Sequence, residues 1–324
     1  MLEGLAVDAI TRVTNVSHAG RRLLTAVDAR KDAGSSPTRI VGHRLARHLL
    51  DAGDQVRVLA EPGLPAGWPD GVEVVEGSIT RPLECAEAFE GVDGVFLAGA
   101  VPATVRDALE VARGAGVRRI VVLSSHGPEY EEAYPPETWF WLAIERAVES
   151  SGMEWTHIRP SAVMGAVIEG TYPATGSDWP DTIKGERAVR EAFLDTGHYP
   201  FIHEDDLAAV AAAALRADDH VGAVVEAVGP PISTRSRVAS IARAIGCDIA
   251  AVEVPPDHSR ESWRRRGWPD SGIDVTLYAL QEYGERLAEL TRWTLDQRPA
   301  VREIIGRPLR GFDEWAAENA HLFR

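Results

Sequence analysis

Residues 118–125, RRIVVLSS, predict a short strand that is apolar on both faces. A strand buried on both sides is typical of a parallel sheet that helices cover on each face. The strand GVFLAGA at 94–100 has the same character, and an amphipathic helix at 102–116 separates the two. This order of strand, helix and strand predicts a right-handed crossover within one parallel sheet.

The same alternation extends outward from this unit. Further elements are expected as strands at 23–27, 55–61, 71–77 and 154–160 and as helices at 44–52, 82–90 and 137–151. We therefore predict an α/β fold, in which a Rossmann-type doubly wound parallel sheet spans 23–162 and an N-terminal extension occupies 1–22.

The alternation weakens in the second half of the chain. We expect 163–324 to form a smaller, mostly helical substrate-binding region beside the carboxyl ends of the strands. Its first part, 165–200, is rich in Gly, Pro, Asp and Trp and is expected to be irregular. A helix at Asp205–Ala217 and a strand at Ala223–Val228 are expected to return and pack on the Rossmann-type domain.

Composition excludes several classes of partner. The net charge of -15 over 324 residues argues against binding to nucleic acid or to an anionic membrane surface. The two cysteines, Cys85 and Cys247, have no second Cys or His at metal-ligand spacing, so no metal site is expected. Without a secretory pattern at the start or an apolar run of membrane-spanning length, the expected location is cytoplasmic. A homo-oligomer is possible.

Four blocks of the chain, in this order, are similar to the NmrA-like branch of the atypical short-chain dehydrogenase/reductases. They are RRIVVLSS at 118–125, AIERAVESSGMEWTHIRPSAVM at 143–164, FIHEDDLAAVAAAAL at 201–215 and REIIGRPLRGFDEWAAENAHLF at 302–323. The resemblance runs from about Arg39 to the C-terminus. It implies a Rossmann domain with a smaller substrate domain, which binds NAD(P)H as a reductase or as a redox sensor.

The glycine-rich phosphate loop of that family is altered in this chain. The family pattern TGATGxxG corresponds to SSPTRIVG at 35–42, where Gly42 is retained and Ser36 and Arg39 replace the other two glycines. Side chains at those positions would project toward the pyrophosphate, and Pro37 removes an amide donor. The alternative is that binding tolerates these changes, since Arg39 could neutralise a phosphate.

Two further cofactor positions differ from the family. Glu61 stands where relatives often carry an Arg for the 2′-phosphate of NADP, and an acid there would favour NAD through the ribose hydroxyls. Ser78, in GSIT, replaces the acidic residue that contacts adenine in relatives. We therefore expect that the chain binds no nicotinamide cofactor, with NAD(P)H as the alternative.

The positions of the family's catalytic pair are altered as well. Short-chain reductases use a Tyr and, four residues later, a Lys; NmrA-like members often have His or Tyr and then Glu. Trp141 and Glu145 occupy these positions in WFWLAIE. Because indole is neither an acid nor a base near neutral pH, the proton donor is missing from this helix. Glu145 is expected to pair with Arg146 or Arg159.

Other polar groups follow the strand at 118–125. Ser125, His126 and Tyr130 lie where catalytic groups sit in this architecture, and an imidazole exchanges protons near neutral pH. A Ser–His nucleophile is disfavoured, because adjacent residues at a strand end point in opposite directions and there is no GxSxG motif. The alternative for His126 is an exposed loop histidine.

Aromatic and apolar residues near the expected mouth of the sheet could line a pocket. The candidates for substrate contact are Trp139, Trp141, Met164, Tyr172 and Trp179. Asp178, beside Trp179, could supply an acid or base. The alternatives are core packing for the aromatic residues and a solvated loop position for the carboxylate.

These observations predict a non-redox enzyme that acts by proton transfer, through His126, Ser125, Tyr130 and Asp178, on a hydrophobic aromatic or polyketide-like molecule of secondary metabolism. Cyclisation, isomerisation, dehydration and rearrangement all fit that chemistry. The first alternative is an NAD(P)H-dependent reductase of a quinone or ketone with an unusual phosphate loop. The second is a non-catalytic NmrA-like sensor.

Overall fold

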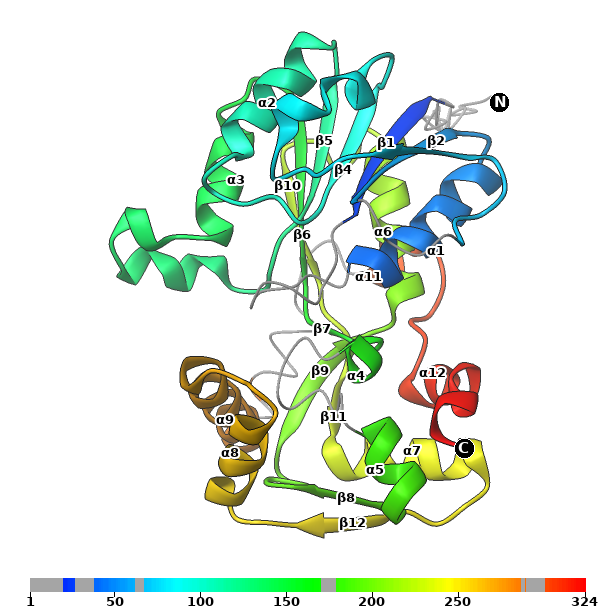
Figure 1. Ribbon diagram of the computed structural model, residues 1–324, viewed down its shortest axis with the longest axis vertical. Coiled ribbons are helices and arrows are strands. Elements are labelled where there is room, and N and C mark those ends of the chain that lie inside the picture. The colour runs from blue at the N-terminus through cyan, green and yellow to red at the C-terminus, as the bar shows by residue number, and fades with distance from the viewer. Residues whose placement is uncertain (1–19, 27–37, 62–66, 170–178, 287–288, 290–300) are drawn as a thin grey trace, which may run out of the picture.

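The computed structural model describes residues 20–26, 38–61, 67–169, 179–286, 289 and 301–324. It consists of a larger lobe built on a parallel sheet and a smaller lobe below it in Figure 1. The larger lobe contains a sheet of seven parallel strands. In spatial order these are β10 (Ala223–Ala227), β6 (Glu154–Pro160), β5 (Arg119–Leu123), β4 (Gly94–Leu97), β1 (Arg21–Ala26), β2 (Gln55–Ala60) and β3 (Val72–Glu76). The predicted Rossmann-type fold is confirmed.

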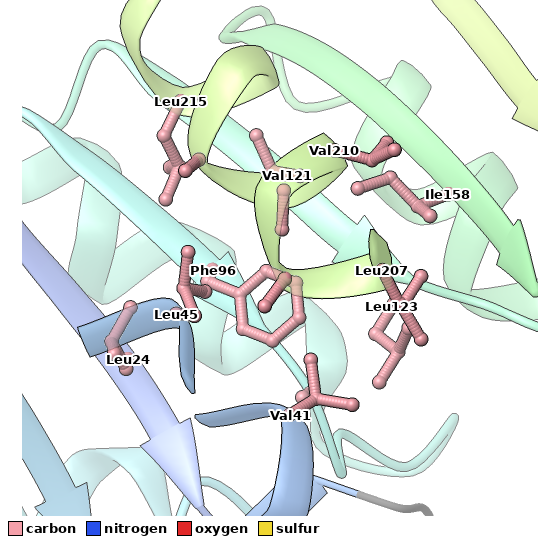
Figure 2. Packing of buried hydrophobic residues seen from close by; sticks show 14 of the residues in the cluster. Leu24, Val41, Leu45, Phe96, Val121, Leu123, Ile158, Leu207, Val210 and Leu215 are labelled. Atoms are coloured by element: carbon pink, nitrogen blue, oxygen red, sulfur yellow. The ribbon is translucent and has the colours of Figure 1, made fainter. Parts of the chain in front are cut away.

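Helices cover both faces of this sheet because neighbouring residues of each strand point to opposite sides. In β1, Leu24 faces α1 (Thr38–Asp51) and α6 (Glu204–Arg216). Leu23 belongs to the core on the other face, where α2 (Val105–Gly114) and α3 (Trp141–Glu149) pack. Figure 2 shows the first core, in which Phe96 of β4 and Val121 of β5 meet Leu45 of α1 and Leu207 of α6.

The strand order reverses between β1 and β4, which are direct neighbours. From this pair the chain winds outward through β2 and β3 on one side and through β5, β6 and β10 on the other. Ligands of such sheets bind outside the carboxyl ends of the strands at this switch point, since the connections there diverge. The fold therefore places the candidate site between the ends of β1, β4 and β5.

The smaller lobe combines short strands with helices. Its sheets are β11–β9–β7, formed by Pro231–Ser233, His198–Ile202 and Ala162–Val163, and β12–β8, formed by Ala250–Glu253 and Ala188–Glu191. Its helices are α4 (Ala166–Glu169), α5 (Trp179–Glu186), α7 (Thr234–Ile245), α8 (Pro256–Arg265), α9 (Asp270–Glu285) and α12 (Phe312–Glu318). A further short helix, α11 (Val301–Ile305), packs on α6 of the larger lobe.

Several expected elements differ from those observed. The segment 165–200 is not irregular throughout, because its described part contains α4, α5, β8 and the start of β9. The expected helix at 82–90 consists of two 3₁₀ turns, at Pro82–Glu84 and Ala86–Phe89. Tertiary contacts stabilise these short elements, and local composition carries little information about such contacts.

The boundaries around the phosphate loop differ too. The first strand begins at Arg21, inside the segment that was expected to precede the domain, and α1 begins at Thr38 rather than at residue 44. Arg39 and Gly42 therefore lie in the first two turns of a helix and not in a loop. Turn-like residues before a helix make its start difficult to locate from sequence.

The expected return of the chain to the larger lobe is observed. Helix α6 covers one face of the main sheet, and β10 adds to its edge in parallel with β6. His203 caps α6, with its Nδ1 accepting a hydrogen bond from the Asp205 amide at 3.0 Å. In the part of the chain that the structure describes, no helix is sufficiently long and apolar to cross a membrane.

Candidate cofactor and catalytic site

The N-terminus of α1 follows β1 at the switch point and has the features of an anion site. The first turn of α1 contains no acidic residue of its own, and the backbone amides and the helix dipole at such an end attract an anion. Gly42 lies close under Trp68, and a Cβ at Gly42 would approach that ring to 3.3 Å. Trp68 also stacks on His43 at 3.9 Å between centroids. Ser36 and Pro37 lie outside the described residues.

Glu61 lies directly after β2, where the ribose of a dinucleotide is bound in this architecture. Its Oε1 accepts a hydrogen bond from the Ser78 hydroxyl at 2.7 Å, and Ser78 lies 2.8 Å from the Thr80 hydroxyl. These hydroxyl groups orient the Glu61 carboxylate at the edge of the sheet. A carboxylate in this position accepts hydrogen bonds from ribose hydroxyls and repels a 2′-phosphate.

A cluster of charged side chains lies beyond the carboxyl ends of β5 and β6. Arg159 donates to Glu145 at 3.0 and 2.7 Å and also contacts Glu129 and Glu226. Glu145 is 1% exposed, and the predicted pairing of Glu145 with Arg159 is confirmed. Burial disfavours the charge on Arg159, but its hydrogen bonds to Glu145 and Glu129 outweigh burial and raise its pKa.

His126 belongs to the same cluster. It follows β5, and its Nδ1 lies 2.9 Å from Oε2 of Glu226 in β10. The other carboxylate oxygen of Glu226 lies 3.4 Å from Nη1 of Arg159, its register partner across β10 and β6. Figure 1 shows these two strands side by side at one end of the sheet. His126 is therefore tied into an ion-pair network and is not an isolated loop histidine.

The other expected catalytic residues are placed as follows. Ser125 is half-buried two residues beyond the end of β5, next to His126. Tyr130 lies in the 3₁₀ segment Pro128–Ala133, but its side chain is outside the described part of the chain. Asp178 also lies outside the described residues. The roles of Ser125, Tyr130 and Asp178 stay predictions.

The expected substrate-contacting residues separate into two groups. Met164 and Trp179 are 2% and 1% exposed within the core of the smaller lobe, where Arg237 lies 4.7 Å from the Trp179 ring. Met164 and Trp179 are therefore core residues, which is the alternative role considered for them above. Trp139 and Trp141 are half-buried beside the start of α3, and the Trp139 indole donates to the Tyr134 carbonyl at 3.0 Å. Tyr172 lies outside the described residues.

Sequence reasoning missed Glu226 and Glu131. Glu226 is the single charge in the apolar strand AVVEAVG, at 223–229, and this isolated charge was the available signal. Glu131 accepts hydrogen bonds from the amides of Phe140, Trp141 and Leu142 at 2.9–3.1 Å and so caps α3. Glu131 precedes that helix by ten residues, so local capping patterns could not identify it.

Comparison with known proteins agrees with this geometry. Residues 38–218 match the model of a family described as NAD(P)H-binding. The chain is 32% identical over 290 residues to the (4-alkanoyl-5-oxo-2,5-dihydrofuran-3-yl)methyl phosphate reductase of Streptomyces griseus, covering 88% of this chain and 96% of that protein. It is 26% identical over 262 residues to the agroclavine dehydrogenase of Claviceps fusiformis, covering 76% and 82%.

Solved structures show the same fold at lower identity. The Citrobacter triphenylmethane reductase complexed with NADP(H) matches with a TM-score of 0.65 at 16% identity, over 93% of this chain and 99% of that one. The regulator NmrA in complex with NAD matches with a TM-score of 0.62 at 16% identity, over 93% and 95%. The chain belongs to the NAD(P)H-binding family, and it has the fold of the triphenylmethane reductase and of NmrA.

Two expectations are corrected by these findings. The prediction of a non-redox cyclase or isomerase is wrong, because the relatives are reductases and dehydrogenases. The expectation that no nicotinamide cofactor binds is wrong as well, since the matched family binds NAD(P)H. The replaced glycines do not exclude a dinucleotide, because backbone amides at the start of α1 and a carboxylate after β2 can still contact one.

The described residues therefore fit a dinucleotide. The start of α1 would hold the pyrophosphate, and Glu61 would hold the adenosine ribose. A bound reduced nicotinamide supplies a hydride. Among the described residues after β5, His126 and the hydroxyl of Ser125 would be candidates to handle a proton.

Proposed function

We propose that this protein is an NAD(P)H-dependent reductase that acts on a small hydrophobic or aromatic acceptor. The observation that carries the proposal is the similarity to a reductase at 32% identity over nearly the whole length of both chains. The sheet, with its switch point between β1 and β4, supports it because this crevice is where a nicotinamide cofactor binds in such folds.

The acceptor class follows from hydride chemistry. A hydride adds to a carbonyl carbon or to a carbon–carbon double bond that is conjugated with a carbonyl, since the carbonyl accepts the negative charge. The 5-oxo-2,5-dihydrofuran ring in the name of the Streptomyces relative contains both groups. We therefore propose an unsaturated lactone, an enone or a quinone as the acceptor.

Glu61 favours NADH over NADPH. Its carboxylate is held by Ser78 at 2.7 Å and would repel a 2′-phosphate, whereas it would accept a hydrogen bond from the free hydroxyl of NADH. We expect the Glu61→Gln variant to lose most of this preference, because the carboxamide keeps the contact with Ser78 and removes the charge. Fluorescence titration with NADH and NADPH measures both dissociation constants.

Glu76→Gln provides the matched control, since Glu76 is an exposed carboxylate at the end of the neighbouring strand β3. It should leave the ratio of the two dissociation constants unchanged. Oxidation of the preferred nucleotide, followed at 340 nm with an unsaturated lactone, an enone and a quinone, then tests the reaction. Failure of the wild-type protein to bind either nucleotide at millimolar concentration would overturn the proposed function.

A further inference from the structure

The carboxylate of Glu226 bridges His126 and Arg159 at the edge of the sheet. We propose that His126 donates the proton that completes reduction of the acceptor, and that Glu226 is the positioning residue that fixes the His126 ring. This inference rests on the proposed reductase function. The proposal assigns the proton to His126. Trp141 occupies the position where related enzymes carry an acid, and its indole cannot donate that proton.

The hydrogen bond between the two side chains determines the tautomer of the neutral His126 ring. The Nδ1–H of His126 donates to Oε2 of Glu226 over 2.9 Å, so the neutral ring carries its proton on Nδ1. Nε2 is then the atom that takes up and releases a proton. The His126 side chain is 25% exposed, which leaves it accessible from the edge of the sheet at the end of β5.

Glu226 is itself held in place by its neighbours. Its Oε1 lies 3.4 Å from Arg159, and Arg159 is anchored by two hydrogen bonds to the buried Glu145. The Glu226 side chain is 14% exposed, on a strand that is paired along its length with β6. A carboxylate with this support keeps its orientation, as a residue that positions an acid must do.

The cluster beside His126 contains charged side chains from four elements. Among the described residues, the ionisable side chains of this cluster are Glu226 from β10, Arg159 from β6, Glu129 from the 3₁₀ segment after β5, and Glu145 from α3. Three carboxylates thus surround one guanidinium.

The reaction balances with these groups. The acceptor gains two electrons and one hydrogen nucleus as a hydride, which leaves the nicotinamide oxidised. The other end of the reduced double bond, either the carbonyl oxygen or the carbon next to a carbonyl, forms a bond to the proton released from Nε2 of His126. The neutral ring keeps its Nδ1–H on Glu226 and regains a proton at Nε2 from water.

The first experiment tests the positioning role without catalysis. Selective ¹⁵N labelling of the ten histidines gives the tautomer of each ring by NMR, and the His126→Asn variant assigns the His126 signals. We expect the Nδ1–H tautomer in the wild-type protein and a mixture of tautomers in Glu226→Gln, because a carboxamide can present either its oxygen or its NH₂ group. Glu132→Gln, at an exposed pair with Arg146, is the control and should change nothing.

The second experiment tests the proton donor. The His126→Asn substitution should lower kcat by about 10²- to 10⁴-fold, while the dissociation constant of the nucleotide stays unchanged. Imidazole added to the buffer should restore part of the activity of His126→Ala. Glu226→Gln should lower kcat at least about 10-fold with little change in KM. The reason is that a neutral ring with its proton on Nε2 no longer offers Nε2 as the atom that takes up and releases the proton. The exposed His258→Asn serves as the control.

The outcomes separate this inference from the proposed function. If the wild-type protein reduces an acceptor and His126→Asn loses less than about 3-fold in kcat, the proton-donor role is overturned and the reductase stands. An unchanged tautomer in Glu226→Gln overturns the positioning role. If the wild-type protein binds no nucleotide, the proposed function fails and the proton-donor role fails with it, whereas the NMR result still decides the role of Glu226.

Discussion

Arg159 shows how one side chain organises the candidate site. Its side chain is 8% exposed and contacts three carboxylates that come from three different elements. A buried guanidinium requires such partners, since its charge loses the solvation of water. Arg159 thus links three carboxylates from three elements into one cluster.

Substituting Glu145 with Gln tests this interdependence. Glu145 is 1% exposed, and the carboxamide would keep at most one good hydrogen bond to Arg159 and lose the opposite charge. We expect a loss of about 2 kcal/mol in the free energy of unfolding, measured by urea denaturation. Glu132→Gln, at an exposed pair, should change the value by less than about 0.5 kcal/mol. Equal effects of the two substitutions would contradict the prediction.

At the scale of elements, a buried arginine secures the C-terminal end of α6. Arg119 is 0% exposed in the first position of β5, and its Nη1 donates to the carbonyl oxygens of Ala217, Ala214 and Leu215 at 2.6, 3.3 and 3.4 Å. The last carbonyl groups of a helix have no partners within the helix, and the helix dipole makes that end negative. One guanidinium thus fastens a helix to the sheet it covers.

Arg119→Lys should weaken this connection. An ammonium group keeps the charge but cannot present the fork of donors that reaches several carbonyl groups, so we expect a loss of about 2 kcal/mol in unfolding free energy. Amide hydrogen exchange in the last turn of α6 should become faster at the same time. Arg118→Lys is the control, because the neighbouring Arg118 side chain is 52% exposed. Unchanged exchange in Arg119→Lys would refute the capping role.

The boundaries of elements mark where sequence reasoning succeeds. Strand β6 is observed at Glu154–Pro160, the same bounds that the apolar pattern predicts. Helix α3 begins four residues later than expected, because Glu131 fixes its start from a separate 3₁₀ segment. Periodicity specifies the interior of an element, whereas its ends depend on partners that can lie elsewhere in the chain.

In the molecule as a whole, the start of α6 joins helix α1 to the C-terminal segment. Asp205 contacts His48 of α1 at 3.0 Å and Arg307 of the C-terminal segment at 3.0 Å. Its hydrogen bond to His48 lowers the pKa of Asp205 to about 2, with Arg310 and Arg44 adding to the effect. The buried His203 beside it has a pKa lowered to about 4, chiefly by burial and then by Arg44.

His203 makes stability depend on pH. Its pKa falls from 6.5 in the unfolded chain to about 4 in the folded one, so the unfolded state binds the proton first as pH falls. The stabilisation is complete above pH 6.5 and is lost as pH falls toward 4, with a size of about 3 kcal/mol. Unfolding free energies measured by urea denaturation across this range should show the decline.

His203→Asn isolates this contribution. An Asn oxygen can cap α6 as the His203 Nδ1 does, but it does not titrate. We therefore expect a flatter dependence of stability on pH between 6.5 and 4 in this variant than in the wild-type protein. The exposed His258→Asn should keep the wild-type slope. Parallel curves for wild type and His203→Asn would show that His203 does not carry the effect.

The sequence was sufficient to infer the parallel sheet, its covering helices and the family, because periodicity and sequence motifs are local properties of the chain. The composition of the candidate site depended on the three-dimensional arrangement of the strands. His126 and Glu226 are 100 residues apart in the sequence, and they meet because β10 joins the sheet beside β6. The tertiary structure also buried Met164 and Trp179 in a core, since burial depends on which distant elements pack against a side chain.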